Sequence, residues 1–305
     1  MSSAASEPAL IGIDWGTSSL RAFLIGAQGE VLDSVATGEG IMQIPDRNFD
    51  AVFDRLVGSF PSNAGLPIVV SGMITSRNGW VETPYVTMPT GPEHLAQSLV
   101  RHQSQSGALI HFVTGATTVY ISGPDVMRGE ETQIIGSAAL GLSDGIFVMP
   151  GTHSKWVHVA LGKIQDFATY MTGEVFASLK DHTILGTLME MSDFDLSAFQ
   201  KGVGAAQDRR ANLLHDLFHV RTLPLMGKLK ETETADFLSG LLIGTEIVAA
   251  LKKNEAKRVT IVGRNDLTDR YEIALQAVGI SCQRAPDDIA AKGHFLIAQA
   301  AGLLT

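Results

Sequence analysis

The alternation of apolar and polar positions in the first 120 residues predicts short strands combined with helices. Residues 9–14 form an apolar run that ends in an acid, and 18–26 and 31–37 extend beyond it with a turn at Gly29. Apolar side chains over 49–60 recur on one helical face. Two further strands are expected at 67–73 and 108–115, with a helix at 94–102 between them. A strand meander followed by alternating helices and strands is typical of an α/β lobe with a mixed sheet.

A similar order of elements begins again at residue 146. Strands are predicted over 146–150 and 164–171, with an extended segment between them that starts at Gly151. A helical stretch follows over roughly 176–251, and its most regular helix is predicted at 234–253. Two last strands complete the set, at 257–263 and 280–285.

The two halves share a short motif as well as an order of strands. When Gly16 is aligned with Gly151, Thr17 falls on Thr152, and the apolar stretches that follow also coincide. Repetition of this kind predicts a duplicated fold. We therefore expect two similar α/β lobes, each a mixed five-stranded sheet flanked by helices, with a cleft between them. The length of 305 residues also exceeds the ~250–300 over which one core usually grows, and we place the lobes at 1–128 and 129–305.

Composition narrows the classes of partner. The chain is 45% hydrophobic and 18% charged, and its formal net charge is −9. Without a basic stripe, nucleic acid and anionic membranes are not expected partners. A single cysteine excludes an intramolecular disulfide. The polar N-terminus lacks the features of a signal peptide, so we expect a cytoplasmic protein.

The paired Gly-Thr turns are candidates for anion binding. A strand that turns tightly at glycine exposes backbone N–H groups, and such a nest commonly binds phosphate. We assign Gly16, Thr17 and Ser18 to one nest and Gly151 and Thr152 to the other. The alternative is that each turn is an ordinary β-hairpin.

An acid stands beside the first turn. Asp14 lies two positions before Gly16 and is placed to meet a Mg²⁺ ion held by phosphates. Arg21 and Lys155, on the strands that leave the two turns, could also reach phosphates, although strand cations often face solvent. His153 could donate to a phosphate or be a plain turn residue.

These motifs resemble the superfamily of actin, sugar kinases and heat-shock ATPases. Residues 11–21 resemble its first phosphate motif, 148–156 its second, and 259–267, with Gly263, its adenosine motif. A closer resemblance is to the 2-dehydro-3-deoxygalactonokinase family. The segments that carry it are 11–24, 71–85, 127–141, 150–157 and 237–246. The resemblance implies an actin-like ATPase (ribonuclease H-like) fold and the use of ATP and Mg²⁺ to phosphorylate the C6 hydroxyl of a 2-keto-3-deoxy sugar acid.

The catalytic base is expected on a helix that precedes the second turn. The hexokinase-like branch carries an aspartate in its second nest, where this chain has only Met149 and Pro150 before the glycine. The glycerol kinase branch instead has an acid at a helix start with a Gln two positions later. Matching that Gln to Gln133 makes Glu131 the base, with Glu130 as the near alternative. Both acids could instead merely satisfy the helix N-terminus.

The carboxylate of the substrate should be bound by a cationic side chain. Arginine suits it better than lysine, because a guanidinium can form two parallel hydrogen bonds to a carboxylate. Residues 75–82 follow a strand end, where open α/β sheets place ligands. Arg77 is the first candidate there, with Asn78 and Trp80 adjacent, although Trp80 could serve packing alone. Arg128 is a second candidate because it precedes the predicted catalytic helix.

Other assignments remain open at this point. A kinase of a related sugar acid or polyol, such as the gluconate epimer, would carry the same motifs. In a different class, an actin-like nucleotide-binding switch would turn over ATP without a sugar. A homodimer is possible. Asp236 and Glu246, on the helix predicted at 234–253, are expected to be caps or surface charges.

Overall fold

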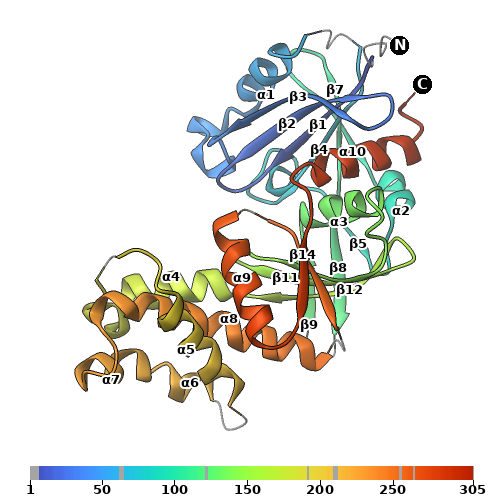
Figure 1. Cartoon of the computed structure of the whole chain (residues 1–305). Coiled ribbons are helices and arrows are strands. Elements are labelled where there is room, and N and C mark those ends of the chain that lie inside the picture. Colours follow the sequence, from blue (N-terminus) through green and yellow to red (C-terminus); the bar gives the residue numbers. More distant parts are fainter. Residues whose placement is uncertain are drawn as a thin grey trace, which may run out of the picture. The chain divides into compact units, whose positions relative to one another are not determined.

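The computed structural model describes residues 7–61, 65–120, 123–190, 192–208, 212–253, 256–263 and 265–304. The chain divides into two compact units, whose elements are labelled in Figure 1. Unit 1 comprises Met1–Asp144, His158–Phe167 and Pro286–Thr305, and unit 2 comprises Gly145–Val157 and Ala168–Ala285. This division differs from the expected lobes chiefly because residues 129–144 and the C-terminal helix pack within unit 1.

Unit 1 is built on a six-stranded sheet with the strand order β3-β2-β1-β4-β7-β6. Its strands are β1 Pro8–Trp15, β2 Leu20–Gly26, β3 Val31–Thr37, β4 Ile68–Ser71, β6 Val100–Gln103 and β7 Leu109–Phe112. β1 pairs antiparallel with β2 and parallel with β4, which pairs parallel with β7. Residues 10–15 of β1 are all buried, because a central strand covered on both faces has no solvent side.

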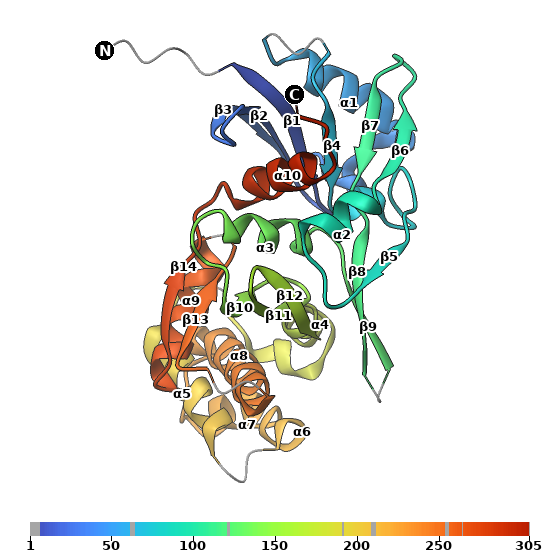
Figure 2. The same cartoon turned by 90° about the vertical axis from the view of Figure 1, so that its right-hand side faces the viewer.

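Helices cover both faces of this sheet. On one face α1, Phe49–Gly58, buries Phe53 in the cluster that contains Ile11 and Ile13. On the other face Leu10 packs in the cluster that contains Ala290 and Ile297 of α10, Ile289–Ala300, which lies beside β1 in Figure 2. Successive side chains of a strand point to opposite faces, so β1 supplies both clusters. The remaining helices of unit 1 are α2 Pro92–Gln97 and α3 Glu130–Ala138, with 3₁₀ turns at Ile41–Gln43, Pro45–Arg47 and Met73–Thr75.

Helices α3 and α10 touch at glycines. A Cβ added at Gly136 would lie 1.8 Å from the Ile289 carbonyl oxygen, and one at Gly293 would lie 1.9 Å from the Thr132 carbonyl oxygen. The two backbones can approach this closely only where neither helix carries a side chain. The contact holds α3 against α10, which itself covers one face of the sheet of unit 1.

The helix expected at 94–102 is wrong over its second half. α2 ends at Gln97, and Ser98 is its C-cap, with a hydroxyl that donates to the Leu95 carbonyl. The chain then forms β6, which pairs antiparallel with β7 at the sheet edge. Its burial alternates between intermediate and exposed, as expected for an edge strand with one face to solvent. This edge strand raises the sheet from the five strands expected to six.

A separate three-stranded sheet leads into α3. Its order is β5-β8-β9, with β5 Tyr85–Thr87, β8 Gly115–Tyr120 and β9 Gly123–Met127. β8 and β9 form an antiparallel pair, and the chain passes from β9 to the start of α3 within three residues.

Unit 2 repeats the sheet of unit 1. Its five strands have the order β12-β11-β10-β13-β14, with β10 Gly145–Met149, β11 Ser154–Ala160, β12 Lys163–Tyr170, β13 Arg258–Ile261 and β14 Ser281–Arg284. Residues 158–167, in β11 and β12, group with unit 1. β13 pairs parallel with both β10 and β14. The order matches β3-β2-β1-β4-β7 position by position, so the predicted duplication is confirmed.

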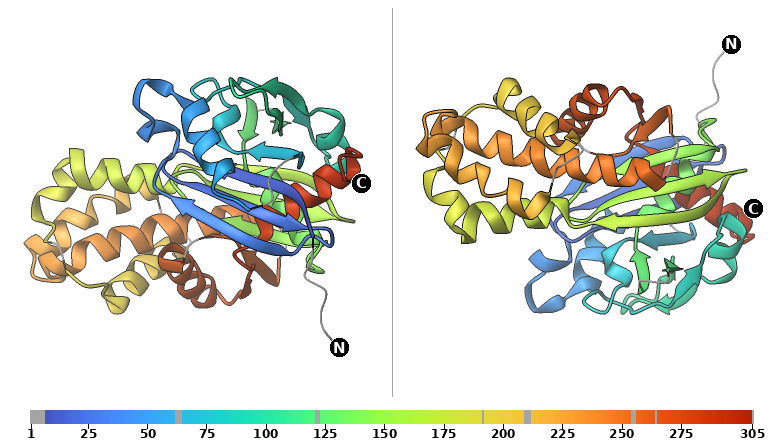
Figure 3. Two further views of the ribbon diagram at one scale, coloured as in Figure 1. Left: turned by 90° about the horizontal axis from the view of Figure 1, so that it is seen from above. Right: turned by 90° about the horizontal axis from the view of Figure 1, so that it is seen from below.

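Between β12 and β13 the described residues are mainly helical. The helices are α4 Thr172–His182, α5 Leu196–Gln207, α6 Leu213–Asp216, α7 His219–Leu225 and α8 Thr234–Lys253, with 3₁₀ turns at Ile184–Leu188 and Glu231–Glu233, and α9 Asn265–Ala277 follows β13. Figure 3 shows α4, in yellow-green, running beside the orange α8. Among the described residues, one helical stretch, Glu231–Lys252, has the length and hydropathy of a membrane span, but 72% of its most apolar 18-residue segment is buried in the fold, as in the core helix of a globular protein.

Candidate active site

The first Gly-Thr turn lies at the exposed end of β1 and β2. The Gly16 N–H donates to the Ser19 carbonyl over 2.8 Å and closes the turn, while Thr17 and Ser18 at its tip are exposed. The Gly16 and Thr17 carbonyls accept from the N–H groups of Ile41 and Met42. A second stretch of backbone therefore fixes the turn from behind while its tip remains open.

Asp14 accepts hydrogen bonds from two side chains beside this turn. Its carboxylate is largely buried and accepts from the Arg21 guanidinium at 2.6 Å. The Gln133 amide, from α3, donates to the same oxygen at 3.4 Å. Arg21, predicted to reach phosphates, is thus paired with Asp14, and the start of α3 is brought to the first turn.

Three segments of backbone meet next to Asp14. A Cβ at Gly72, after β4, would lie 2.6 Å from the Trp15 carbonyl oxygen, and one at Gly129 would lie 2.9 Å from the Gly72 Cα. Both glycines also adopt positive φ, +99° and +107°, which other residues rarely adopt. The ends of β1 and β4 and the N-terminus of α3 are therefore held together by two glycines that no side chain could replace without strain.

The two acids at the start of α3 differ in exposure. Glu131 is 1% exposed; both of its oxygens accept from the Gly129 N–H, at 2.8 and 2.9 Å, and one accepts from the Thr132 hydroxyl. Glu130 is half-buried and accepts from the Arg128 N–H at 2.9 Å. Residue 130 lies one helical turn before Gln133, on the same helix face. Glu130 therefore shares the face that meets Asp14, whereas Glu131 is enclosed by its own helix start.

Burial makes Glu131 a weak acid. Desolvation, followed by the neighbouring charge of Glu130, raises its pKa from 4.5 to about 7. The folded protein holds the Glu131 proton more tightly than the unfolded chain does. The stabilisation that follows is complete below pH 4.5 and is lost as the pH rises through 7.

The wild-type protein should therefore lose about 3 kcal/mol of unfolding free energy between pH 4.5 and 8, and Glu131→Gln should not show this loss. Urea unfolding of both proteins at several pH values measures it, and identical pH slopes would contradict it.

The predicted substrate loop after β4 is ordered by Arg128. The Arg128 guanidinium is buried and donates to the Thr75 carbonyl and hydroxyl, at 2.6 and 2.8 Å, and to the Thr83 carbonyl at 3.0 Å. It also stacks over the Tyr85 ring at 4.3 Å. Arg128, expected near substrate, therefore joins the two ends of the loop at residues 75–83.

Within this loop the predicted residues separate into two groups. Arg77 and Asn78 are exposed at the tip, and Arg77 forms no ion pair with any described residue. Trp80 instead points into the core, within 5.1–6.5 Å of five other rings, those of Trp15, Phe49, Phe53, His102 and Phe112. The structure thus gives Trp80 a packing role and leaves Arg77 available at the loop tip.

The second Gly-Thr turn belongs to unit 2. Thr152 and His153 are exposed, and His153 pairs with Glu174 of α4. A Cβ at Gly173 would lie 2.5 Å from the Gly151 carbonyl oxygen, so the start of α4 lies directly behind the turn. Lys155, expected to reach phosphates, is buried and donates to the Thr169 hydroxyl at 2.9 Å.

Glycine at position 151 is not required by the fold. Its φ lies outside the left-handed region, and an added Cβ would have no neighbour closer than 3.9 Å. Gly263, after β13, has a φ of +149° and lies near Pro150, with 3.8 Å between its added Cβ and the Pro150 carbonyl. Residue 264, in the expected adenosine motif, lies outside the described residues.

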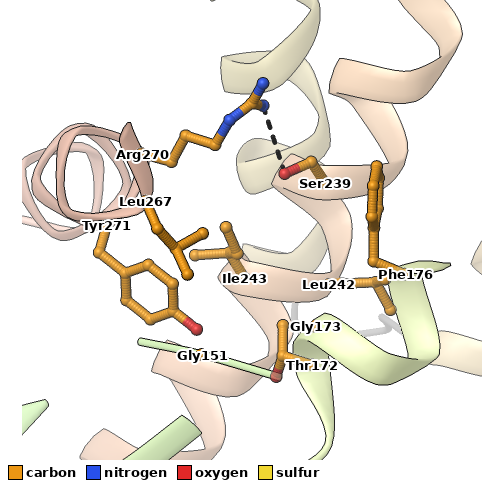
Figure 4. A pocket seen from close by; sticks show the side chains of 10 residues that line it. All are labelled: Gly151, Thr172, Gly173, Phe176, Ser239, Leu242, Ile243, Leu267, Arg270 and Tyr271. Atoms are coloured by element: carbon orange, nitrogen blue, oxygen red, sulfur yellow. Dashed lines mark hydrogen bonds between the residues drawn. The ribbon is translucent and has the colours of Figure 1, made fainter. Parts of the chain in front are cut away.

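A pocket opens beside the second turn (Figure 4). Gly151, Thr172 and Gly173 line one side, and Tyr271 and Arg270 of α9 line another. Its other lining residues are mostly apolar and come from α4, α8 and α9: Phe176, Ser239, Leu242, Ile243 and Leu267. An apolar pocket with a few convergent polar groups is the usual form of a small-molecule site.

Comparison with known proteins identifies the family. The model of the 2-keto-3-deoxy-galactonokinase family matches residues 14–297. The chain belongs to this family. The galactonokinase-family relatives include "Probable 2-dehydro-3-deoxygalactonokinase DgoK1" of Rhizobium meliloti (strain 1021), 34% identical over 92% of this chain and 93% of the relative. A second is the 2-dehydro-3-deoxygalactonokinase of Escherichia coli (strain K12), 35% identical over 92% of this chain and 94% of the relative.

Solved structures agree with the family and extend the fold beyond it. A 2-dehydro-3-deoxygalactonokinase-family protein from Sinorhizobium meliloti superimposes with a TM-score of 0.87 at 32% identity, covering 95% of this chain and 98% of that one. The (R)-2-hydroxyglutaryl-CoA dehydratase component A of Acidaminococcus fermentans has a TM-score of 0.54 at 12% identity, covering 97% and 100%. The actin-like ATPase fold that the sequence motifs imply is confirmed.

Two acids of this galactonokinase-family chain, Asp236 and Glu246, were expected to be caps or surface charges, and neither is a surface charge. Asp236 stands in the first turn of α8 and accepts from the Asp195 N–H, as a cap does. Asp236 is 6% exposed and pairs with Arg270 at 2.7 Å. Glu246 is 3% exposed and accepts three side-chain hydrogen bonds. The spacing along the helix pointed to this burial: Asp236 lies seven positions before the buried Ile243 and Glu246 three positions after it, so both acids share the helix face that packs inward.

Proposed function

We propose that this chain transfers the γ-phosphoryl group of ATP to the C6 hydroxyl of 2-dehydro-3-deoxy-D-galactonate, giving the 6-phosphate and ADP. The observation that carries the proposal is family membership over residues 14–297, in a family whose curated relatives are named for this reaction. The geometry of unit 1 supports it, because an exposed Gly-Thr turn, a buried aspartate and an acidic helix start adjoin one another.

Glu130 is the acid we assign to the attacking hydroxyl. A base must reach the proton that it accepts. Glu130 has accessible surface on the helix face of Gln133, whereas both oxygens of Glu131 are occupied by the start of their own helix. This reverses the order expected from the sequence, in which Glu131 came first, and the choice between the two acids remains a prediction.

The donor set beside the first turn fits Mg²⁺ bound through phosphates rather than by the protein alone. Among the described residues no cluster of three or more His, Cys, Asp or Glu side chains could hold a metal. Asp14 offers one carboxylate, already paired with Arg21, which suits contact through water. When bound with ATP, the ion would neutralise charge on the phosphoryl group.

The exposed Arg77 is our candidate for the carboxylate of the sugar acid. Arg128 and the Thr75 and Thr83 groups that it bonds hold both ends of the loop, so the tip is presented from a fixed base. A bidentate guanidinium–carboxylate pair would give both affinity and orientation. Asn78 lies beside it at the exposed tip.

The pocket of unit 2 is our candidate for the adenosine end of ATP. The pocket is bounded by the second turn and by α8 and α9, and its Leu267 closes the expected adenosine motif. Both Gly-Thr turns are expected to contact phosphates, with His153 at the tip of the second.

Gly151→Ala should separate ATP use from folding. We expect the thermal midpoint to stay unchanged, because the added methyl has no protein neighbour within 3.9 Å. We also expect KM for ATP to rise by about tenfold, since a methyl there blocks close approach of a phosphate to the backbone. Kinetics with each substrate varied in turn test this, and an unchanged KM for ATP would remove the second turn from the site.

An ADP-release assay tests the function as a whole. The substrates are 2-dehydro-3-deoxygalactonate, its gluconate epimer, glycerol and no sugar. We expect release that depends on the galactonate compound. Equal release without sugar would favour an actin-like switch instead, and preference for the gluconate epimer would keep the class and change the substrate. Localisation in the cytoplasm and assembly as a homodimer remain expectations.

A further inference from the structure

A buried carboxylate in unit 2 has no task in the proposed reaction. Glu246, in the middle of α8, is 3% exposed. Its Oε1 accepts from the Trp156 indole N–H at 2.8 Å, and its Oε2 accepts from the Tyr271 hydroxyl at 2.7 Å and from the Thr172 hydroxyl. Three neutral donors on one buried anion form a complete and directional site.

The network continues one step further, to the second Gly-Thr turn. The Ser154 and Tyr271 hydroxyl oxygens lie 2.7 Å apart. Because the Tyr271 hydroxyl donates its proton to Glu246, the Ser154 hydroxyl is the donor in this bond. Ser154 directly follows the exposed turn at 151–153, so the turn is tied to α8 through a tyrosine.

The donors come from the elements that enclose the pocket. Ser154 and Trp156 belong to β11, Thr172 begins α4, and Tyr271 lies on α9. Thr172 and Tyr271 themselves line the pocket (Figure 4). Residue 173, next to Thr172, supports the Gly151 backbone from behind. A single carboxylate therefore gathers the turn, the start of α4 and one pocket wall.

Stability alone is a poor reason for this arrangement. A buried charge costs desolvation, and apolar residues of similar volume often stabilise a core as well or better. Burial raises the pKa of Glu246, and the hydrogen bonds from Thr172, Tyr271 and Trp156 act against that rise. The carboxylate fixes the orientation of each side chain that donates to it, which an apolar side chain could not do.

We propose that Glu246 is a positioning residue for nucleotide binding, which sets the second Gly-Thr turn and the wall of the adjacent pocket through Ser154, Thr172, Trp156 and Tyr271. The inference rests on the proposed function for the assignment of this pocket to ATP. Glu246 itself contacts no substrate, and it acts through the residues that it orients.

The test compares two network variants with one control on the same helix. Glu246→Gln keeps the volume but replaces an acceptor oxygen by a donor amide, and Tyr271→Phe removes only the link between Ser154 and Glu246. Thr234→Val is the control, because Thr234 is fully buried and its hydroxyl bonds the Lys230 carbonyl, away from the turn. For each full-length protein the measurements are the thermal midpoint, the dissociation constant of ATP by calorimetry, and KM for each substrate.

We expect both network variants to raise the ATP dissociation constant and KM for ATP by about tenfold, the effect of one misplaced hydrogen bond. KM for the sugar acid should stay within about twofold, and Thr234→Val should lower the thermal midpoint alone. If both network variants lower only the thermal midpoint, as the control does, the inference is overturned.

Two further outcomes keep the inference and the proposed function apart. If Glu246→Gln does not fold, Tyr271→Phe decides, because it leaves the carboxylate and the ring in place. A wild-type protein that binds ATP but phosphorylates no sugar acid would remove the proposed function, and weaker ATP binding by the variants would still support the inference. A wild-type protein that binds no ATP would overturn the inference about Glu246.

Discussion

Glu130→Gln is expected to lower kcat by about 10²–10⁴-fold, the usual effect of losing a positioned acid or base. KM for ATP should change little, since the substitution removes an interaction made to the reacting hydroxyl and not to the nucleotide. The fold should be kept, because glutamine has the same volume and its oxygen can still accept from the Arg128 N–H. Steady-state kinetics with both substrates, at a pH where the wild type is fully active, measure the effect.

Glu131→Gln is the matched control for this experiment. The glutamine oxygen can still accept from the Gly129 N–H, so the start of α3 should be preserved. We expect kcat to fall far less than in the Glu130 variant. The reverse result, with Glu131→Gln inactive and Glu130→Gln active, would show that Glu131 leaves its enclosed position to act as the base.

Gly202→Ala is expected to destabilise the protein by about 3 kcal/mol through overpacking of two helices. Gly202 of α5 faces α8, and an added Cβ would lie 2.2 Å from the Phe237 carbonyl oxygen and 2.6 Å from the Leu241 nitrogen. Backbone atoms cannot move aside as a side chain does, so the helices must separate. Urea unfolding followed by circular dichroism measures the change.

The same helix provides the control. Gly204 is exposed two positions later, and an added Cβ there would meet nothing within 4 Å. Gly204→Ala should therefore stabilise the protein by about 1 kcal/mol, the ordinary helix preference of alanine over glycine. Equal effects of the two substitutions would mean that the approach of α5 to α8 does not depend on the glycine.

The elements best predicted from sequence are those whose signal is local. The helix expected at 234–253 is α8, Thr234–Lys253, because apolar residues recur through 20 positions. The strand before the first turn is β1, whose buried run is continuous. The sequence predicts helix over most of the edge strand β6, because the strand is only four residues long and lies close after α2. Such a strand is fixed by pairing with β7, a contact that no local pattern contains.

Those features of the candidate site that depend on short motifs could be predicted from the sequence. Those that depend on tertiary packing could not. The Gly-Thr turns lie at strand ends with exposed tips, as expected. Which of Glu130 and Glu131 is enclosed depends on where the helix start folds back. The burial of Glu246 depends on donors from β11, α4 and α9, which are up to 90 residues away in the chain. Sequence spacing carries no record of such distant partners.

The C-terminal helix α10 determines when unit 1 can become complete. The face of the sheet that contains Leu10, Ile25 and Val69 is covered by Ala290 and Ile297 of α10. While a ribosome is still making residues 145–285, that face lacks the cover that α10 provides, although every strand of the sheet has already been synthesised. The N-terminal half must therefore wait, with apolar surface exposed, until residues 286–305 have been synthesised, and a gene fragment that stops at residue 144 would yield an unfinished half rather than a domain.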